Sequence, residues 1–201
     1  MREPTVYVVD DDDSIRELLG WLMRHNGLAV ETHASARDFF KGWSDDGPAC
    51  LVLDLHMPDM SGLDVQQYLK DHGISIPVIF LSGRADVPKA VHAVKSGAVD
   101  FIEKPFDYKH IVALVRQCLE RDALARRGRE RGRQAAERLA TLSQREREVL
   151  DRVVAGKLNR EIAEEHDISI KTVEAHRARI MEKLEVGSLA ELVQATLSAG
   201  T

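Results

Sequence analysis

The sequence predicts an α/β domain with a doubly wound, five-stranded parallel sheet, followed by an all-α domain of four helices that contains a helix-turn-helix. Three observations carry this prediction. Short β-branched runs alternate with amphipathic stretches through the first 120 residues. Three of these runs are almost entirely apolar, which is typical of strands that helices cover on both faces. After Leu139 the helical period continues and no convincing strand remains.

The first domain should contain five strands joined by helices. The predicted strands are Thr5–Val9, Leu28–Glu31, Cys50–Asp54, Val78–Leu81 and Phe101–Glu103. The predicted helices lie near Ser14–Asn26, Ser35–Gly42, Leu63–His72 and Val87–Ser96, and a fifth begins near Tyr108. Glycines stand where three of these helices should end, at Gly27, Gly73 and Gly97. Such β/α repeats place a functional site at the carboxyl ends of the strands.

A change of composition separates the two domains. Residues 121–138 contain seven arginines and two glycines, Gly128 and Gly132, which predicts a linker that is helical in part. We therefore expect a first domain over residues 1–120, this linker, and a second domain over residues 139–201.

Capping boxes mark two of the four helices in the second domain. The Ser143–Glu146 box opens a helix that ends near Gly156, and the Ser188–Glu191 box opens the last helix. Between them the pattern predicts a short helix over Arg160–His166, a turn at Asp167–Ser169 and a longer helix over Lys171–Glu185. The tight turn between the second and third helices describes a helix-turn-helix unit.

Composition and charge narrow the functional classes. No apolar run approaches the ~20 residues that cross a bilayer, and the N-terminal sequence turns acidic where a signal peptide would be apolar. We expect a cytoplasmic protein without membrane insertion, with Cys50 and Cys118 as buried thiols. Residues 1–120 hold 12 Lys/Arg against 19 Asp/Glu, a net charge of −7, and residues 121–201 hold 16 against 14, a net of +2. The second half is therefore the candidate for a polyanionic partner.

Acidic side chains follow two of the predicted strands. Asp10 and Asp11 come directly after the first strand, and Asp54 ends the third. Because the ends of neighbouring strands meet at one edge of a parallel sheet, these carboxylates should converge, and a hard cation such as Mg²⁺ (or Mn²⁺) would relieve their repulsion. Ser82 and Lys104 end the fourth and fifth strands, where a hydroxyl and an ammonium suit a transferred phosphoryl group. Asp54, alone at its strand end, is the natural nucleophile.

Each of these residues taken singly has an ordinary structural interpretation. The acidic run at 10–13 would suit a solvated helix start, Ser82 a turn hydroxyl and Lys104 a surface charge. All of them at strand ends, in one order along the chain, favour a phosphoryl site.

The ordered segments VVDDDD, LVLDLHMPDMSGL (51–63), VIFLSGRADVP (78–88) and AVDFIEKPF (98–106) resemble the receiver domain of two-component response regulators, a flavodoxin-like fold. The resemblance covers residues 5–120. It implies that Asp54 is the phosphoacceptor. It also implies that Asp10, Asp11 and Asp54 bind the metal ion together with the backbone carbonyl of His56.

The same resemblance implies how the phosphoryl group is sensed. Lys104, followed by Pro105 in a cis peptide, would pair with the phosphoryl group. Ser82 would be the switch hydroxyl and Phe101 the switch aromatic, so that Phe101 rotates into the space that Ser82 vacates. A phosphoryl group adds up to about two negative charges, which is enough to drive such a local change.

The segment from Leu142 to Val193 resembles the LuxR/GerE type of helix-turn-helix domain, with a match over residues 139–197. The receiver segment SGRADVPKAVHAVKSGAVDFIEKPF narrows the likeness to the FixJ branch of response regulators. These resemblances imply a bacterial transcription factor that a histidine kinase phosphorylates. They imply promoter DNA and RNA polymerase as partners, and a homodimer that forms on phosphorylation.

Helical geometry independently predicts which face of the Lys171–Glu185 helix meets DNA. With Val173 inward, Ile180 and Leu184 share its side. The residues on the opposite side are Lys171, Ala175, Ala178 and Glu182, and those that flank them are Thr172, Glu174, Arg179 and Lys183. The two alanines allow close approach to the groove, the cations can contact phosphate or guanine, and Glu174 can accept from a cytosine amino group. Many LuxR-type domains carry lysine in place of Glu174, so base selection or exclusion is expected there.

Two alternatives compete with a phosphorylation-switched regulator. Haloacid-dehalogenase-like phosphatases also use a metal, an aspartate nucleophile and a lysine, but they carry a second aspartate where this chain has His56. A pseudo-receiver on a constitutive DNA binder is opposed by the intact set of pocket residues. The predicted protein is therefore not an enzyme, apart from autophosphorylation and autodephosphorylation at Asp54.

Overall fold

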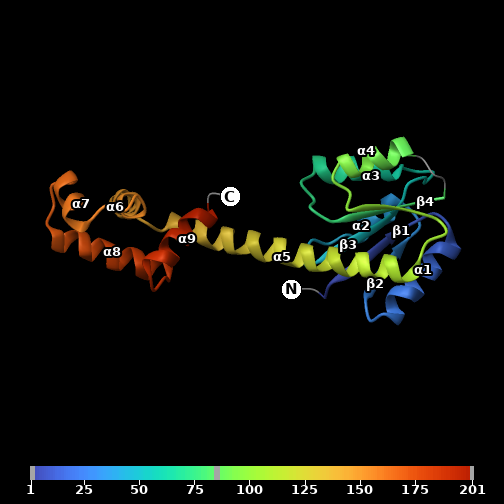
Figure 1. Cartoon of the computed structure of the whole chain (residues 1–201), viewed down its shortest axis with the longest axis horizontal. Coiled ribbons are helices and arrows are strands. Elements are labelled where there is room, and N and C mark those ends of the chain that lie inside the picture. The colour runs from blue at the N-terminus through green and yellow to red at the C-terminus, as the bar shows by residue number, and fades with distance from the viewer. Residues whose placement is uncertain (1–2, 84–86, 200–201) are drawn as a thin grey trace. The chain divides into compact units, whose positions relative to one another are not determined.

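The computed structural model describes residues 3–83 and 87–199, and the chain divides into two compact units between Arg126 and Arg127. The first unit is a five-stranded parallel sheet with the strand order β2-β1-β3-β4-β5. Helices pack on both faces of this sheet (Figure 1). Its strands are β1 Thr5–Val9, β2 Ala29–His33, β3 Ala49–Asp54, β4 Val78–Ser82 and β5 Asp100–Glu103. Its helices are α1 Asp13–His25, α2 Ala36–Gly42, α3 Gly62–Asp71, α4 Val87–Lys95 and α5 Tyr108–Ala140, of which α5 continues into the second unit.

Alternate residues of β1, β3, β4 and β5 pack into two separate cores, one on each face of the sheet. Tyr7 and Val9 pack with α2, α3 and α4 on one face of the sheet, whereas Val6 and Val8 pack with α1 and α5 on the other. The apolar strands are explained by this double burial. The predicted doubly wound fold is confirmed, and β2 extends to His33 because it stays paired with β1 as far as Val9.

The sheet order places β1 and β3 side by side at its centre, with Val9 opposite Leu53. Asp10 and Asp54 therefore leave adjacent strands at the same edge of the sheet. Gly27, Gly73 and Gly97 follow α1, α3 and α4 with φ angles of 72°, 66° and 94°. This left-handed conformation ends helices at little cost in glycine.

Helix α5 runs without interruption through the whole of the predicted linker, residues 121–138. Its residue Asp122 is buried, where it accepts a hydrogen bond from Ala49 N at 2.9 Å and one from Arg126 Nε at 2.7 Å. These contacts join α5 to the first unit beyond residue 120. They explain why this unit extends to Arg126, past the predicted end of the first domain.

The second unit contains the end of α5 and four further helices. These are α6 Gln144–Val154, α7 Asn159–Glu165, α8 Ile170–Leu184 and α9 Leu189–Ala199. Apolar residues of α6, α7, α8 and α9 form one core around Val149, Ile162 and Val173. The Ser143–Glu146 capping box is present.

The capping box predicted at the start of α9 is present only in part. Glu191 N donates to Ser188 Oγ at 3.2 Å, as a capping box requires, but the Glu191 carboxylate accepts from Gly187 N at 2.7 Å instead of from Ser188 N. Within residues 3–83 and 87–199, no helix is long and apolar enough to cross a membrane.

Candidate functional site

Four predicted site residues stand at the carboxyl edge of the sheet. Asp54 and Ser82 are the last residues of β3 and β4, Asp10 follows β1, and Lys104 follows β5. The Lys104 Nζ lies 2.6 Å from Asp10 Oδ2 and 2.6 Å from Asp54 Oδ1. The structure therefore brings three side chains from separate strand ends into one charged cluster.

The charges in this cluster are shifted by burial and by one another. Asp10 is only 1% exposed, and desolvation raises the pKa of its carboxyl despite the hydrogen bond from Lys104, which lowers it. Desolvation lowers the pKa of Lys104, but its hydrogen bonds to Asp10 and Asp54 outweigh this effect and the pKa is raised. One ammonium group is thus held between two carboxylates that would otherwise repel each other.

Backbone groups fix the orientation of both carboxylates. Asp54 Oδ2 accepts from His56 N at 2.6 Å, and Asp10 Oδ1 accepts from Asp12 N at 3.0 Å. Arg16 donates to the backbone oxygen of Asp10 at 2.7 Å, which holds the turn after β1 in place. These bonds aim the carboxylates before any ligand arrives.

The neighbouring aspartates have different surroundings. Asp12 is the N-cap of α1. Its carboxylate accepts a hydrogen bond from Ser14 N at 2.8 Å and so caps the start of this helix. Asp11 is exposed and faces the same pocket as Asp10. The pocket has a volume of about 550 Å³ and is lined by Asp10, Asp11, Asp12, Asp54, His56, Gly83 and Lys104.

The donors around this pocket suit a hard cation. Among the described residues, no three His, Cys, Asp or Glu side chains lie close enough together to form a complete metal site. Magnesium does not need one, because it binds through one or two carboxylates and completes its shell with water and phosphate oxygens. The His56 imidazole Nε2 lies 3.1 Å from Lys89 Nζ, so its side chain is engaged elsewhere and only its backbone carbonyl is a candidate ligand.

The predicted switch residues lie on neighbouring strands. Ser82 is fully buried at the end of β4, and its backbone oxygen accepts from Lys104 N at 2.7 Å. Phe101 lies on β5, partly buried against the core that α2, α3 and α4 cover. Gly83, the residue after Ser82, is the one that lines the pocket.

Gly62 is a site residue that sequence reasoning did not single out. A Cβ atom on Gly62 would lie 2.5 Å from the Asp54 backbone oxygen and 2.9 Å from Phe80 Cε1. Only glycine lets α3 begin this close to the end of β3. The signal in the sequence was the glycine after Ser61, but its reason is a contact across the fold that the sequence does not show.

The second unit presents the predicted face of α8 to solvent. Val173, Ile180 and Leu184 are buried in the core, as the helical period predicted. The residues Lys171, Thr172, Glu174, Ala175, Ala178 and Arg179 are all exposed. This exposed face combines two cations, one carboxylate and two small side chains, so the backbone of α8 is open to close approach.

Lys183 differs from the other residues predicted to meet DNA. Its Nζ lies 2.7 Å from Glu146 Oε2 and donates to Thr141 O at 3.2 Å. The hydrogen bond from Lys183, together with that from Ser143 N, lowers the pKa of Glu146 to about 2. Lys183 therefore forms an ion pair with Glu146 within the second unit, because α8 passes the start of α6 at this point. These contacts of Lys183 do not support a role for it in DNA binding.

Two family models match the chain. The model described as "Response regulator receiver domain" matches residues 6–142, and the model described as "Bacterial regulatory proteins, luxR family" matches residues 140–196. Together they account for both structural units.

Full-length relatives support both matches. The transcriptional regulatory protein FixJ of Rhizobium meliloti (strain 1021) is 44% identical over 200 residues, which cover all of this chain and 98% of FixJ. The response regulator protein TodT of Pseudomonas putida F1 is 43% identical over 97% of this chain and 86% of its own length. Among solved structures, the response regulator StyR is 40% identical with a TM-score of 0.88, covering 97% of this chain and 98% of StyR. Full-length FixJ of B. japonicum is 35% identical with a TM-score of 0.60, covering all of this chain and 98% of FixJ.

The charged cluster at the sheet edge and the exposed face of α8 thus lie in the two domains that these matches define. The chain belongs to the FixJ-like response regulators: it is a transcription regulator with a LuxR-type DNA-binding domain, controlled by phosphorylation of its receiver domain.

Proposed function

We propose that Asp54 accepts a phosphoryl group from the phosphohistidine of a histidine kinase, and that the modified protein dimerises and binds promoter DNA. The observation that carries this proposal is the Lys104 ammonium held 2.6 Å from both Asp10 and Asp54. In the transfer, a carboxylate oxygen of Asp54 forms a bond to phosphorus while the phosphorus–nitrogen bond to the kinase histidine breaks. The products are an acyl phosphate on Asp54 and an unphosphorylated histidine side chain on the kinase.

The cation that we propose for this site is Mg²⁺ or Mn²⁺. Its candidate ligands are the carboxylates of Asp10, Asp11 and Asp54 and the backbone carbonyl of His56, with water completing the shell where a carboxylate does not reach the ion. When bound, it would supply positive charge to the phosphoryl oxygens. The raised pKa of Asp10 supports this assignment, because a carboxylate whose charge is disfavoured by burial gains from a second cation nearby.

Residues of this chain perform the remaining tasks. Lys104 releases one carboxylate and pairs with a phosphoryl oxygen, since it already lies between the two acids. We assign Ser82 the role of hydroxyl donor to the phosphoryl group and Phe101 the role of the aromatic side chain that changes rotamer. The same pocket supports autophosphorylation by small acyl phosphates and slow hydrolysis by water, which are the only reactions that we propose for it.

The exposed face of α8 is the DNA surface that we propose. Lys171 and Arg179 supply phosphate or guanine contacts, and Glu174 selects a cytosine or excludes other bases. Ala175 and Ala178 bring the helix close to the groove, and Thr172 can donate to phosphate. Histidine kinase, promoter DNA and RNA polymerase are the proposed partners, in a bacterial cytoplasm. Relatives named transcriptional regulatory protein support this assignment.

Mass spectrometry of the intact protein tests the phosphoacceptor. With Mg²⁺ and acetyl phosphate, the wild-type chain should gain one acid-labile phosphoryl group, and Asp54→Asn should gain none. Asp59→Asn is the matched control, because Asp59 is an exposed aspartate in the segment that follows Asp54 and should leave the modification intact. If Asp54→Asn gains the same phosphoryl group, Asp54 is not the phosphoacceptor.

A further inference from the structure

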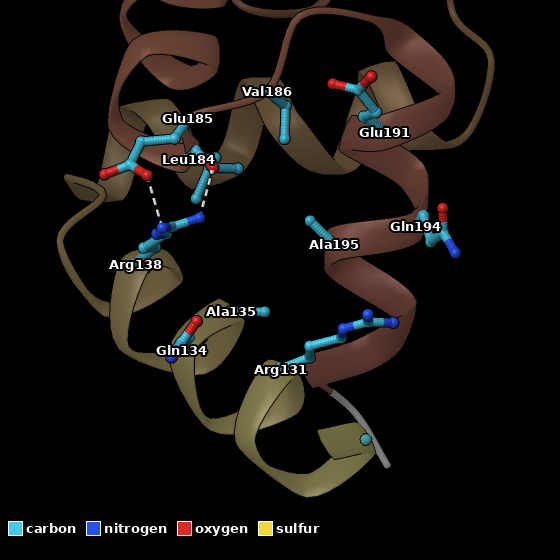
Figure 2. Close-up of a pocket in the computed structure, with 11 residues that line it drawn as sticks. Arg131, Gln134, Ala135, Arg138, Leu184, Glu185, Val186, Glu191, Gln194 and Ala195 are labelled. Carbon is cyan, nitrogen blue, oxygen red and sulfur yellow. Dashed lines mark hydrogen bonds and ion pairs between the residues drawn. The ribbon is translucent and has the colours of Figure 1, made fainter. Parts of the chain in front are cut away.

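The end of the recognition helix α8 is held by a residue of the long helix α5. Arg138, in the part of α5 that belongs to the second unit, donates from Nη1 to the backbone oxygen of Leu184 at 3.4 Å. Its Nη2 lies 2.5 Å from Glu185 Oε2. Figure 2 shows the guanidinium of Arg138 directed at both residues, where the C-terminal turn of α8 ends.

This contact satisfies groups that a helix end leaves without a partner. The last four carbonyls of an α-helix have no intrahelical donor, and the partial negative charge there favours a cation. Arg138 supplies both a donor to the carbonyl of Leu184 and a positive charge close to the end of α8. A planar guanidinium can bridge a carbonyl and a carboxylate at once, which a lysine ammonium does less well.

Glu185 has a backbone conformation that glycine adopts at a lower energetic cost. It is the C-cap of α8, with φ 54° and ψ 44°, in the left-handed region that disfavours residues with a Cβ atom. Its carboxylate is the group that reaches Arg138. The residue in this strained conformation therefore carries a side chain that joins the end of α8 to α5.

Arg138 and Glu185 both line a pocket. This pocket of about 510 Å³ lies between this part of α5 and α9, and the small side chains of Ala135 and Ala195 face it from the two helices (Figure 2). Leu139 packs against the core of the second unit next to Arg138. The end of α5 thus contacts this unit through Leu139 in the core and through the bonds of Arg138 to the end of α8.

We propose that Arg138 and Glu185 form a positioning pair for DNA binding, which couples the end of α5 to the orientation of the recognition helix. The inference rests on α8 being the DNA-contacting helix, as proposed above. Arg138 acts through α8 and does not touch DNA. Any change in the end of α5 then reaches the DNA-binding face through this pair.

The test measures affinity of the full-length, acetyl-phosphate-treated protein for a duplex that the wild type selects from random DNA. Arg138→Ala and Glu185→Ala should each weaken binding by about threefold to fivefold, because a partly exposed pair is worth little more than this. The double variant should lose no more than either single variant. Arg131→Ala is the matched control and should keep wild-type affinity, since Arg131, two turns earlier on α5, makes no hydrogen bond or ion pair with any described residue.

Two further measurements separate positioning from other roles. The slope of log affinity against log salt should stay unchanged in Arg138→Ala, whereas a direct phosphate contact would lower it by about one. Glu185→Gly relieves the backbone strain, so its melting temperature should stay level or rise while its affinity falls. If Arg138→Ala and Glu185→Gly both bind the duplex with wild-type affinity, the proposal that this pair positions α8 is wrong. If Lys171→Ala and Arg179→Ala also bind normally, the proposed DNA face is wrong instead.

Discussion

At the scale of the residue, Asp10 is kept in a position that costs stability. Its pKa is raised by burial, so the folded state holds a proton more tightly than the unfolded chain does. The free energy of unfolding therefore falls as pH rises from the ordinary aspartate pKa through the raised one. A buried acid that lowers stability in this way fits the cation site that we propose.

Asp10→Asn should consequently stabilise the metal-free protein at neutral pH, by on the order of 1 kcal/mol. Below the ordinary pKa of aspartate, at about 3.9, both proteins carry a neutral side chain and the difference should vanish. Urea unfolding at several pH values measures this. The same variant should no longer be phosphorylated by acetyl phosphate with Mg²⁺, and a destabilised variant at neutral pH would contradict the account.

Glu146 differs from Asp10 because its pKa is lowered, to about 2, first by the hydrogen bond from Lys183 and then by that from Ser143 N. Its contribution to stability is therefore present above the ordinary pKa of 4.5 and is lost as pH falls through about 2. Glu146→Gln should unfold at a lower temperature than the wild type at neutral pH, and the gap should narrow between these two pH values. Calorimetry of the two proteins checks this, and a gap that stays constant with pH would count against the ion pair.

At the scale of the element, the start of α3 depends on Gly62. Gly62→Ala would place a methyl group 2.5 Å from the Asp54 backbone oxygen, which cannot move without shifting β3. We expect a loss of about 2 kcal/mol in the free energy of unfolding and slower phosphorylation of Asp54. Gly128→Ala on α5 is the control, since its Cβ meets no described atom within 4 Å, and it should stabilise the chain by up to about 1 kcal/mol. Equal effects of the two changes on stability would contradict this view.

The elements themselves could be predicted because their signals are local. Hydrophobic period, capping boxes and glycine stops placed the described strands, and the described helices other than the second half of α5, within a few residues. Gly62 and the Lys183–Glu146 pair could not be predicted, because both depend on contacts between elements distant in sequence. The continuity of α5 was hidden by the glycines at 128 and 132, which helical neighbours outweigh.

At the scale of the whole molecule, one chain joins a receiver domain to a DNA-binding domain. We propose that acyl phosphate formation at Asp54 changes the charge in a pocket of the first unit, and that the result is read out as occupancy of DNA by the second. On this proposal the pocket sets a state instead of making a product, which fits an aspartate and a lysine in the pocket of a regulator.

The central claim is that phosphorylation of Asp54 increases DNA binding. The most direct measurement compares the affinity of wild type and Asp54→Asn for the selected duplex, with and without acetyl phosphate and Mg²⁺. The account predicts an increase of about tenfold for the wild type, within the usual range of coupling between two sites, and no change for Asp54→Asn. An equal increase in both proteins, or none in the wild type, would contradict it.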